Sequence, residues 1–445
     1  MPTTTPTLNV VLLGCGTVGT EVARILAEDE AELTARTGAR LALAGVGVRD
    51  TSKDRGPHVS PSIVTDRLEE LVDRADVVVE LMGGLDPAGG LIERALRAGK
   101  TVVSANKALI AARLGQLSGA AAESGVQFSY EAAVAGAIPI LRPIRDSLAG
   151  DRITSIMGIV NGTTNYVLDS MTTTGAGFEE ALATAQELGY AEADPTADVD
   201  GHDAAAKAAI LASLGLHTTF PLEEVHTEGI RSVTAEDIAS AKAAGYVIKF
   251  LAIAERVSRG AEEGQSGEAS ESAAVRVHPT LIPEDHPLAS VRGAFNAVYV
   301  QAENAGELMF MGQGAGGAPT ASAVMGDLVS AARRVVAGGP GRTETADRAL
   351  PALPFAQTRT RFAVSVAVED EPGVLADIAR VFADHGQSIE SMVQTRGLDG
   401  EQRPVAELRI ITHDGLEGDL RATVDDIHGL PAVTRRPTFM RVGGN

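Results

Sequence analysis

The stretch TLNVVLLGCGTVGTEVARIL, residues 7–26, decides the fold because it joins a short apolar strand pattern to a helical pattern through three glycines. Gly14, Gly16 and Gly19 stand at the spacing GxGxxG, directly after the strand and at the start of the helix. The first glycine permits the turn, the second lets a pyrophosphate approach the backbone, and the third lets the helix pack on the strand. The context therefore favours a dinucleotide site over a purely structural glycine turn, and it leaves Cys15 as a small packed residue of that turn.

Outward from this stretch, residues 7–150 alternate short β-branched runs with helical segments. Runs such as LALAGVGV, DVVVELM and KTVVSA are separated by stretches with helical spacing. Strands that alternate with helices of this length form a parallel sheet with helices on both faces. We therefore predict a doubly wound α/β domain of the Rossmann type over residues 1–150.

The choice of dinucleotide depends on the end of the second predicted strand. That strand ends in Gly47-Val48-Arg49-Asp50, with Lys53 and Arg55 just beyond it. An arginine at this place suits the 2′-phosphate of NADP, whereas an acidic residue there holds the ribose hydroxyl of NAD. Arg49 favours NADP, and Asp50 keeps NAD open.

Beyond residue 150 the pattern changes to a mixed α+β domain, which we expect over residues 151–314. A helix at about 315–340 is expected to return to the nucleotide domain, and a Pro-rich linker follows at 341–358. Residues 359–445 show a strand-helix-strand-strand-helix-strand order, which is typical of a ferredoxin-like sandwich with a regulatory role. The segment 259–272 lacks large apolar residues, and we interpret it as a solvated excursion without an assigned function.

Composition excludes several classes of partner. The formal charge is −21, tryptophan is absent and aromatic residues make up 3% of the chain, so nucleic acid and anionic membrane surfaces are poor partners. The N-terminal residues carry no signal-peptide pattern and no apolar run is long enough to span a membrane, so a cytoplasmic location is expected. The single cysteine, Cys15, excludes an intramolecular disulfide and a thiolate metal cluster.

The richest chemistry lies in GYAEADPTADVDGHDAAAKAAI, residues 189–210. Its DVDG resembles the middle of a calcium loop, but the bidentate glutamate of such a loop would fall on Lys207, which cannot bind a cation. Asp203 stands four residues before Lys207, so on a helix the two side chains share one face. Small and apolar neighbours make a partly buried lysine more plausible than an exposed ion pair, and such a lysine can act as a proton donor.

Several motifs together resemble the homoserine dehydrogenase family. They are GCGTVG, SANKAL at 104–109, EAAVAGAIPI at 131–140, NGTTNYVL at 161–168 and, above all, ELGYAEADPTADVDGHDAAAK. The segment DEPGVLADIA in the tail looks like an ACT domain, as on the monofunctional members of this family. The resemblance covers nearly the whole chain and implies NAD(P)-dependent interconversion of L-aspartate 4-semialdehyde and L-homoserine, on the route to threonine and methionine.

The resemblance also implies roles for particular residues. Lys207 would donate and accept the proton, Lys107 would lie beside the nicotinamide and substrate, and Glu192 with Asp203 would hold the substrate. Independently of the resemblance, Asp194, Asp198 and Asp200 are expected to cap helices or order the loop, because Asp favours N-cap positions. The residues implied to bind the cofactor are Gly14, Gly16, Thr17, Val18, Gly19, Arg49, Ser104, Lys107, Gly189 and Gly314. Those implied to surround a monovalent cation, with Na⁺ expected, are Glu131, Val134, Gly136 and Ile138.

Three further expectations concern regulation, assembly and rival functions. Threonine is expected as an allosteric ligand at the turn and helix start of EDEPGVLADIARVF, although a tail that only dimerises is the alternative. Pairing of middle-domain sheets is expected to give a homodimer or homotetramer. An aldehyde-oxidising semialdehyde dehydrogenase would need a cysteine nucleophile, and Cys15 lies in the phosphate turn. A non-catalytic NAD(P) and amino-acid sensor would leave Asp203 and Lys207 unexplained.

Overall fold

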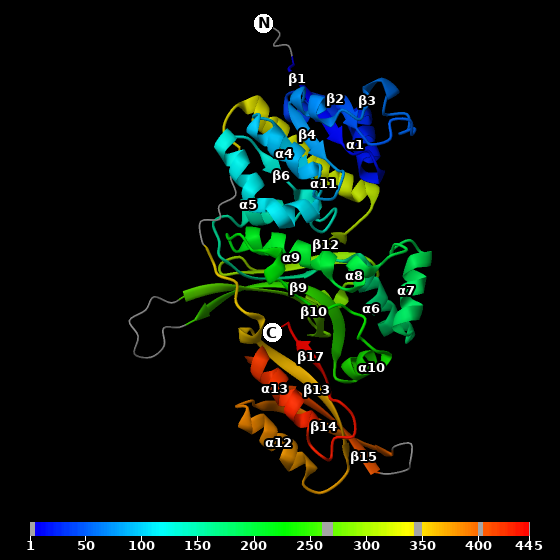
Figure 1. Cartoon of the computed structure of the whole chain (residues 1–445), viewed down its shortest axis with the longest axis vertical. Coiled ribbons are helices and arrows are strands. Elements are labelled where there is room, and N and C mark those ends of the chain that lie inside the picture. The colour runs from blue at the N-terminus through cyan, green and yellow to red at the C-terminus, as the bar shows by residue number, and fades with distance from the viewer. Residues whose placement is uncertain (1–4, 260–269, 342–348, 399–403, 445) are drawn as a thin grey trace.

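A computed structural model describes residues 5–259, 270–341, 349–398 and 404–444. Three regions follow one another along the long axis, with the nucleotide domain at one end, the tail at the other and a large sheet between them (Figure 1). Most of the predicted excursion 259–272 and part of the predicted linker 341–358 lie outside the described residues. Among the described residues, no helix has both the length and the apolar character needed to cross a membrane.

The nucleotide domain contains a parallel six-stranded sheet in the order β3-β2-β1-β4-β5-β6. The prediction of a doubly wound α/β fold is confirmed, and the strand order reverses between β1 and β4, where such sheets bind their ligands. The strands are β1 (Thr7–Leu13), β2 (Arg40–Gly47), β3 (Val64–Thr65), β4 (Val77–Glu80), β5 (Thr101–Ser104) and β6 (Phe128–Ser129). The helices are α1 (Thr17–Glu28), α2 (Glu30–Thr37), α3 (Leu68–Asp73), α4 (Ala88–Arg97) and α5 (Lys107–Ser124).

One late helix completes this domain. Helix α11 (Gly317–Ala337) returns from the middle of the chain, and its Ala321, Val324 and Leu328 belong to the same buried cluster as Val10 of β1 and Val22 of α1. At the start of α11, a Cβ on Gly317 would lie 2.9 Å from the side chain of Thr17. The glycine therefore lets α11 begin directly against the first turn of α1.

The middle domain is a sheet with its central helix on the face toward the nucleotide domain, whereas a later helix, α10 (Ala235–Ala243), lies on the side toward the tail (Figure 1). Its central helix α9 (His202–Gly215) lies between the two domains, and every residue from Asp203 to Gly215 is buried. Alanine and glycine allow this close packing, since a Cβ on Gly215 would overlap Ile156. The strands are β7 (Ile153–Ile159), β8 (His226–Thr227), β9 (Tyr246–Arg259), β10 (Ser270–Pro283), β11 (Phe295–Ala302) and β12 (Gly306–Gln313). The other helices are α6 (Gly162–Thr174), α7 (Phe178–Glu187), α8 (Thr196–Val199) and α10 (Ala235–Ala243).

The tail has the predicted ferredoxin-like order of strands and helices. These elements are β13 (Arg359–Glu369), α12 (Val374–Asp384), β14 (Ile389–Leu398), β15 (Pro404–Thr412), β16 (Gly415–Leu416), α13 (Glu417–His428) and β17 (Thr438–Val442). Alternate residues of β13, from Phe362 to Val368, pack against Ile378 and Phe382 of α12 and Leu420 of α13.

The tail is not a separate body joined only by a linker. Strand β17 pairs with β13 of the tail and also with β10 of the middle domain, where Thr280 and Leu281 lie opposite Arg441 and Val442. The sheets of both domains are therefore one continuous sheet, in the order β12-β11-β7-β9-β10-β17-β13-β15-β14. The sequence pattern did not predict this pairing.

Candidate active site

The turn after β1 has the geometry that a bound pyrophosphate requires. Gly14 has a φ of +100°, and a Cβ there would lie 2.7 Å from the backbone of Leu81. A Cβ on Gly19 would lie 2.6 Å from the carbonyl oxygen of Gly14, so this glycine brings α1 against the turn. A Cβ on Gly16 would meet nothing within 4 Å, so its backbone faces open space at the start of α1. Thr17 and Val18 follow in the first turn of that helix.

The end of β2 carries the residues that bear on the choice of dinucleotide. Arg49 is exposed, whereas the carboxylate of Asp50 accepts hydrogen bonds from the backbone and hydroxyl of Ser52 at 2.9 and 2.6 Å. The pKa of Asp50 is lowered mainly by these bonds, so the residue stays ionised beside the site. The guanidinium of Arg55 bridges the site by donating to the carbonyl oxygens of Cys15 at 2.7 Å and Asp50 at 2.9 Å. The sequence placed Arg55 just beyond this strand, but its contact with Cys15, which spans 40 residues of chain, was not predicted.

Two lysines from different domains meet at one carboxylate. Lys207 of α9 donates from Nζ to Asp203 Oδ2 at 2.7 Å and to the carbonyl oxygen of Val160 at 2.6 Å. Lys107, the first residue of α5, forms an ion pair with the other oxygen, Asp203 Oδ1. Lys207 is 8% exposed and Asp203 6%, whereas the side chain of Lys107 is 47% exposed and so reaches the pair from the open side. The structure thus brings together the three residues expected at the reacting centre.

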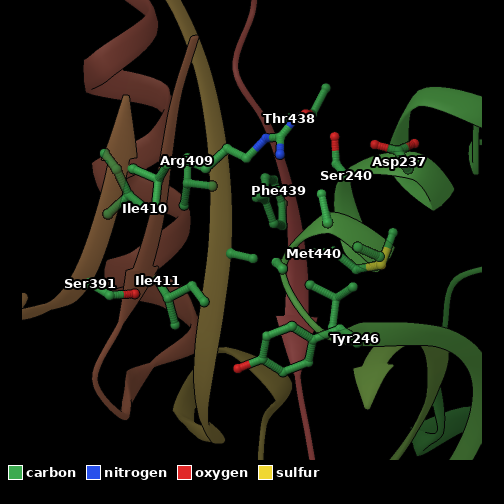
Figure 2. Close-up of a pocket in the computed structure, with 17 residues that line it drawn as sticks. Asp237, Ser240, Tyr246, Ser391, Arg409, Ile410, Ile411, Thr438, Phe439 and Met440 are labelled. Atoms are coloured by element: carbon green, nitrogen blue, oxygen red, sulfur yellow. The ribbon is translucent and has the colours of Figure 1, made fainter. Parts of the chain in front are cut away.

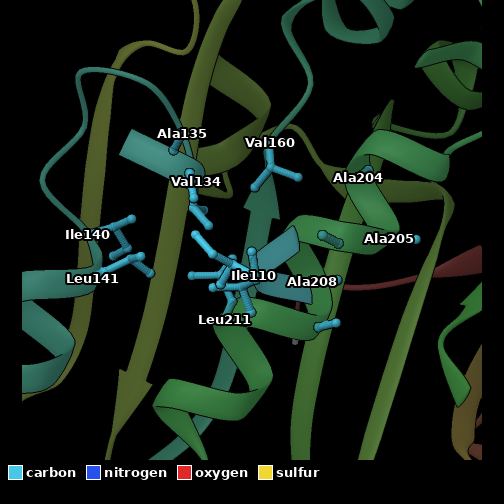
Figure 3. Packing of buried hydrophobic residues seen from close by; sticks show 14 of the residues in the cluster. Ile110, Val134, Ala135, Ile140, Leu141, Val160, Ala204, Ala205, Ala208 and Leu211 are labelled. Carbon is cyan, nitrogen blue, oxygen red and sulfur yellow. The ribbon is translucent and has the colours of Figure 1, made fainter. Parts of the chain in front are cut away.

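Packing below the lysines fixes this arrangement. Figure 3 shows Ile110 of α5 against Ala208 and Leu211 of α9, with Val134 and Val160 in the same cluster. Each of these five residues is at most 1% exposed. The helices that carry Lys107 and Lys207 are therefore held against each other by apolar contacts, and the ion pairs lie at the edge of that packing.

The charge of Asp203 is maintained by its surroundings. Burial raises the pKa of this carboxyl, but the charges of Lys207 and Lys107 and their hydrogen bonds outweigh burial and hold it well below its usual range. Asn161 adds a neutral donor, because its Nδ2 lies 2.9 Å from Asp203 Oδ2 and 2.7 Å from Asp198 Oδ1. Asn161 also caps α6, so the NGTT segment links this helix to the acidic loop.

A buried glutamate positions the start of α5. Glu80 at the end of β4 accepts a hydrogen bond from the hydroxyl of Ser104 at 2.7 Å and from the backbone of Met82 at 2.8 Å. Burial raises the pKa of Glu80. Ser104 Oγ in turn accepts from the backbone of Asn106, which caps the helix that begins at Lys107. The hydroxyl of Ser104 is therefore engaged inside the protein. No sequence motif pointed to Glu80.

The remaining residues of the acidic loop separate into distinct roles. Asp194 accepts a hydrogen bond from the backbone of Thr196 at 3.1 Å, and Asp200 pairs with Arg231 at 2.5 Å. These contacts order the loop, as expected. Glu192 is exposed and its carboxylate contacts no other described residue, so the structure does not bring it to Asp203. Gly189, just after α7, has a φ of +77° and open space at its Cβ position.

In the loop expected to hold a cation, the carboxylate of Glu131 is engaged in hydrogen bonds, whereas three backbone carbonyl oxygens accept none from backbone N–H groups of the described residues. Both carboxylate oxygens of Glu131 accept N–H bonds, from the backbones of Ile140 and Leu141 at 2.6 and 2.8 Å and from Arg142 at 2.8 Å. Among the described residues, no backbone N–H is bonded to the carbonyl oxygens of the loop residues Val134, Gly136 and Ile138. Glu131 therefore holds the shape of the loop through its carboxylate.

The same loop touches the predicted cofactor residue Gly314. A Cβ on Gly136 would lie 2.4 Å from the carbonyl oxygen of Gly314, and Ala137 donates from its backbone to Gln313 at 3.0 Å. Over the described part of the chain, no three His, Cys, Asp or Glu side chains gather as a metal site. A cation in this loop would therefore depend on backbone carbonyls.

Comparison with known proteins agrees with this geometry. The profile described as "Homoserine dehydrogenase, NAD binding domain" matches residues 14–131, "Homoserine dehydrogenase" matches 139–329 and "ACT domain" matches 362–432. A homoserine dehydrogenase from Corynebacterium glutamicum is 49% identical over 437 residues, which cover 98% of this chain and 95% of that protein. The chain belongs to the homoserine dehydrogenase family. It is an NAD(P)-dependent oxidoreductase that reversibly reduces L-aspartate 4-semialdehyde to L-homoserine.

Solved homoserine dehydrogenases share the fold over different lengths of chain. That of Thiobacillus denitrificans has a TM-score of 0.88 and 38% identity, with 98% of each chain covered. A hyperthermophilic archaeal homoserine dehydrogenase in complex with NADPH has a TM-score of 0.60 and 28% identity, and it covers 76% of this chain and 100% of its own. The NAD-binding, catalytic and ACT regions are thus present here on one chain.

Proposed function

We propose that Lys207 transfers the proton in this reaction while Lys107 stabilises charge on the substrate oxygen. The observation that carries the proposal is the contact of both lysines with opposite oxygens of Asp203. Reduction of an aldehyde adds a hydride to the carbonyl carbon and a proton to its oxygen, and the bound nicotinamide supplies the hydride. An ammonium group that is already fixed by Asp203 and Val160 can give its proton without first being reoriented.

Asp203 has two tasks in this proposal. It holds the ammonium groups of Lys107 and Lys207 close together, one at each carboxylate oxygen. The two lysines therefore need to move little when negative charge develops on the substrate oxygen. Its negative charge, with that of exposed Glu192, also suits the α-ammonium group of the substrate. Glu192 would have to approach as the substrate binds, because its exposed carboxylate pairs with neither Asp203 nor any other residue in the described part of the chain.

A direct assay tests the proposed chemistry and the choice of cofactor together. Oxidation of NADPH and of NADH would be followed with L-aspartate 4-semialdehyde, with the wild-type chain and with Lys207→Ala. The proposal requires turnover by the wild type and loss of turnover, with cofactor binding retained, in the variant. Turnover that survives in a folded Lys207 variant would exclude the proposed role.

We infer that NADP is preferred over NAD, although NAD remains usable. Arg49 is exposed at the end of β2 and has no partner among the described residues, so its guanidinium is free for a 2′-phosphate. Ser52 engages one oxygen of Asp50, which weakens the competing interaction with a ribose hydroxyl. Among related structures, the archaeal homoserine dehydrogenase contains NADPH.

We also propose a monovalent cation, with Na⁺ as the ion, at the carbonyl oxygens of Val134, Gly136 and Ile138. The support is that these oxygens lack backbone donors while Glu131 holds the loop by its carboxylate. Because Gly136 touches Gly314, the ion would stiffen the junction between the nucleotide domain and α11. Activity measured in sodium, potassium and choline salts at equal ionic strength tests this proposal, and equal rates would contradict it.

The tail is proposed to regulate the enzyme in response to threonine, the end product of the route. The support is its ACT profile and its continuous sheet with the middle domain. Inhibition of the full chain by millimolar threonine is the expected result, and unchanged activity would contradict it. We further place the enzyme in the cytoplasm, where the nicotinamide pool is found.

We propose that two or four copies assemble through the middle sheet. Phe295 is 44% exposed and Met311 50% exposed. By strand alternation both lie on the same face as the buried cluster of Ala297, Tyr299 and Met309. Apolar side chains continuous with a buried cluster suit a partner surface. Sedimentation should show a dimer or tetramer, and a monomer at micromolar concentration would contradict the proposal.

A further inference from the structure

A cavity of about 140 Å³ lies between the tail and the middle domain (Figure 2). It is bounded on one side by α10 and the start of β9, and on the other by the face of the tail's sheet that points away from α12 and α13. Strand alternation gives this placement, because Val364, Leu408 and Ile410 belong to the core beneath the helices. On β15, Arg409 and Ile411 alternate with the core residues Leu408 and Ile410. Both Arg409 and Ile411 line the cavity.

Most of the cavity wall is apolar. Ala241 of α10, Ala244 directly after that helix, Leu281 of β10, Ile411 of β15 and Met440 of β17 all line it. At about 10–15 Å³ for each water-sized occupant, the volume accommodates roughly ten non-hydrogen atoms. The space therefore suits a small molecule with an aliphatic part.

The polar groups at the cavity are of opposite charge and are not paired with each other. Arg409 forms no hydrogen bond or ion pair with any described residue, and its Nε is buried without an acceptor. In Figure 2 its guanidinium extends toward Thr438, and Ser240 and Asp237 lie on the opposite wall, on α10. Asp237 uses Oδ2 to accept two hydrogen bonds from Thr234, at 2.8 and 2.9 Å, and its other oxygen has no partner. A buried guanidinium nitrogen without an acceptor is unfavourable unless a ligand supplies one.

We propose that this cavity binds a small α-amino acid with an aliphatic side chain. Its carboxylate would accept hydrogen bonds from the fork of Arg409, which matches carboxylate geometry. Its ammonium group would face Asp237, and its side chain would contact Ile411 and Met440. The ligand would touch both the middle domain and the tail, so its binding would stabilise one arrangement of the two.

The turn before α12, which the sequence favoured, offers a poorer site for a carboxylate. Asp370 and Glu371 precede the helix, and Asp377 lies in its first turn, so three carboxylates surround the exposed backbone N–H groups. Asp370 is already paired with Arg396 at 3.2 Å. The cavity instead presents Arg409, which has no hydrogen-bond or ion-pair partner among the residues that the structure describes. This inference rests on the proposed regulation through the tail and gives it a location.

Calorimetry on the full-length chain tests the proposal with L-threonine, L-isoleucine, L-valine and L-methionine as probes. At least one of them should bind, and Arg409→Ala should weaken that binding at least about ten-fold, with partial recovery in Arg409→Lys. Ala244→Phe fills the cavity from an exposed position directly after α10 and should abolish binding without disturbing the core. Arg380→Ala, at an exposed arginine on α12, is the matched control and should bind as the wild type does. Turnover without amino acid should be unchanged in all four variants.

The possible outcomes distinguish an error in the proposed binding site from an error in the proposed regulation. If an amino acid binds and inhibits the wild type, Arg409→Ala and Ala244→Phe alike, the cavity is not the site while regulation stands. If binding is lost in those variants but turnover of the wild type never responds, the cavity is a binding site and the proposed regulation is wrong. If no probe binds the full chain at millimolar concentration, the proposed site is wrong. Should Arg409→Ala fail to fold by circular dichroism, Ala244→Phe and Arg409→Lys still decide the matter.

Discussion

Lys107 and Lys207 contact opposite oxygens of the Asp203 carboxylate, although one begins a helix of the nucleotide domain and the other lies in the middle domain. The reacting centre is therefore assembled only when α5 and α9 are packed together. Any change that separates these helices, even without touching substrate, should lower turnover. Four predictions follow from this and related contacts.

Replacing Lys207 by alanine should lower kcat at least about 10²-fold, because the proposed proton donor is lost. Binding of NADPH, measured by fluorescence titration, should change little, since Lys207 contacts Asp203 and Val160 rather than the phosphate turn. Lys242→Ala removes an exposed lysine of α10 and is the matched control. A folded Lys207→Ala chain with kcat within a few-fold of wild type would contradict the assignment.

Replacing Arg49 by alanine should raise KM for NADPH about ten-fold or more and leave KM for NADH nearly unchanged. The reason is that a 2′-phosphate, which only NADPH carries, would lose its guanidinium partner. Lys53→Ala, four residues further along the same segment, controls for a general loss of positive charge. Equal effects of Arg49→Ala on both cofactors would mean that another residue, with Arg55 the nearest alternative, recognises the phosphate.

Replacing Lys249 by methionine should make stability less dependent on pH in the alkaline range. Lys249 is 1% exposed and donates to the carbonyl oxygen of Val291 at 2.5 Å, and burial lowers its pKa to about 8 from 10.5. Below pH 8 both folded and unfolded states carry the charge and the fold bears the whole desolvation cost, roughly 3 kcal/mol. As pH rises from 8 to 10.5 the folded state loses its proton first, so this cost disappears and the wild type gains stability.

The methionine variant lacks both the desolvation cost and the two hydrogen bonds that Lys249 donates, to the carbonyl oxygen of Val291 and to Asn165 Oδ1. Its free energy of unfolding should exceed that of the wild type by about 1–2 kcal/mol at pH 7, and the difference should fall and change sign toward pH 10, because the wild type regains roughly 3 kcal/mol. Denaturant titrations at several pH values measure it, with exposed Lys242→Met as the control. A difference that stays constant across this range would show that Lys249 does not titrate there.

Replacing Glu228 by glutamine should loosen the tail from the middle domain. Glu228 accepts hydrogen bonds from Arg441 of β17 at 2.7 and 2.9 Å and from Arg421 of α13 at 2.5 Å. Although burial raises the pKa of Glu228, hydrogen bonds from His226 and Arg441 and the charge of Arg441 hold it well below its usual range. The stabilisation is thus present above the ordinary glutamate pKa and is lost as pH falls below it.

The expected cost of Glu228→Gln is about 2 kcal/mol, less than for a fully buried pair because the side chain of Glu228 is 35% exposed. Hydrogen exchange should increase in β17, and the difference from wild type should vanish in acid. Glu224→Gln, an exposed carboxylate nearby in the chain, should change neither quantity. Unaltered exchange in β17 would mean that strand pairing alone holds the tail.

Local patterns were sufficient to predict much of this molecule. The glycines of the phosphate turn follow from backbone geometry within six residues, and the stacking of Asp203 on Lys207 follows from helical periodicity. The ferredoxin-like order of the tail could be read from successive strand and helix patterns. These features depend on neighbours in the chain, which is where sequence carries its clearest physical signal.

Contacts between distant segments were not predictable in the same way. The bonds from Arg441 to Glu228 join residues 213 apart, and the contact of Arg55 with Cys15 depends on how the loop after β2 folds back. A carboxylate looks the same in sequence whether it binds an ion or a loop, so the bonds that Glu131 accepts from the backbones of Ile140 and Arg142 could not be foreseen. Such cases need the tertiary arrangement.

The pairing of β10 with β17 has a consequence for synthesis on the ribosome. Thr280 and Leu281 emerge long before their partners Arg441 and Val442, so this part of β10 is an open strand edge in the nascent chain. Open edges invite pairing with other chains and aggregation. Translation through Val442 is therefore required before the middle domain can protect its own edge, and chains that stall or are cleaved within the tail should be recognised by chaperones and proteases as unfinished products.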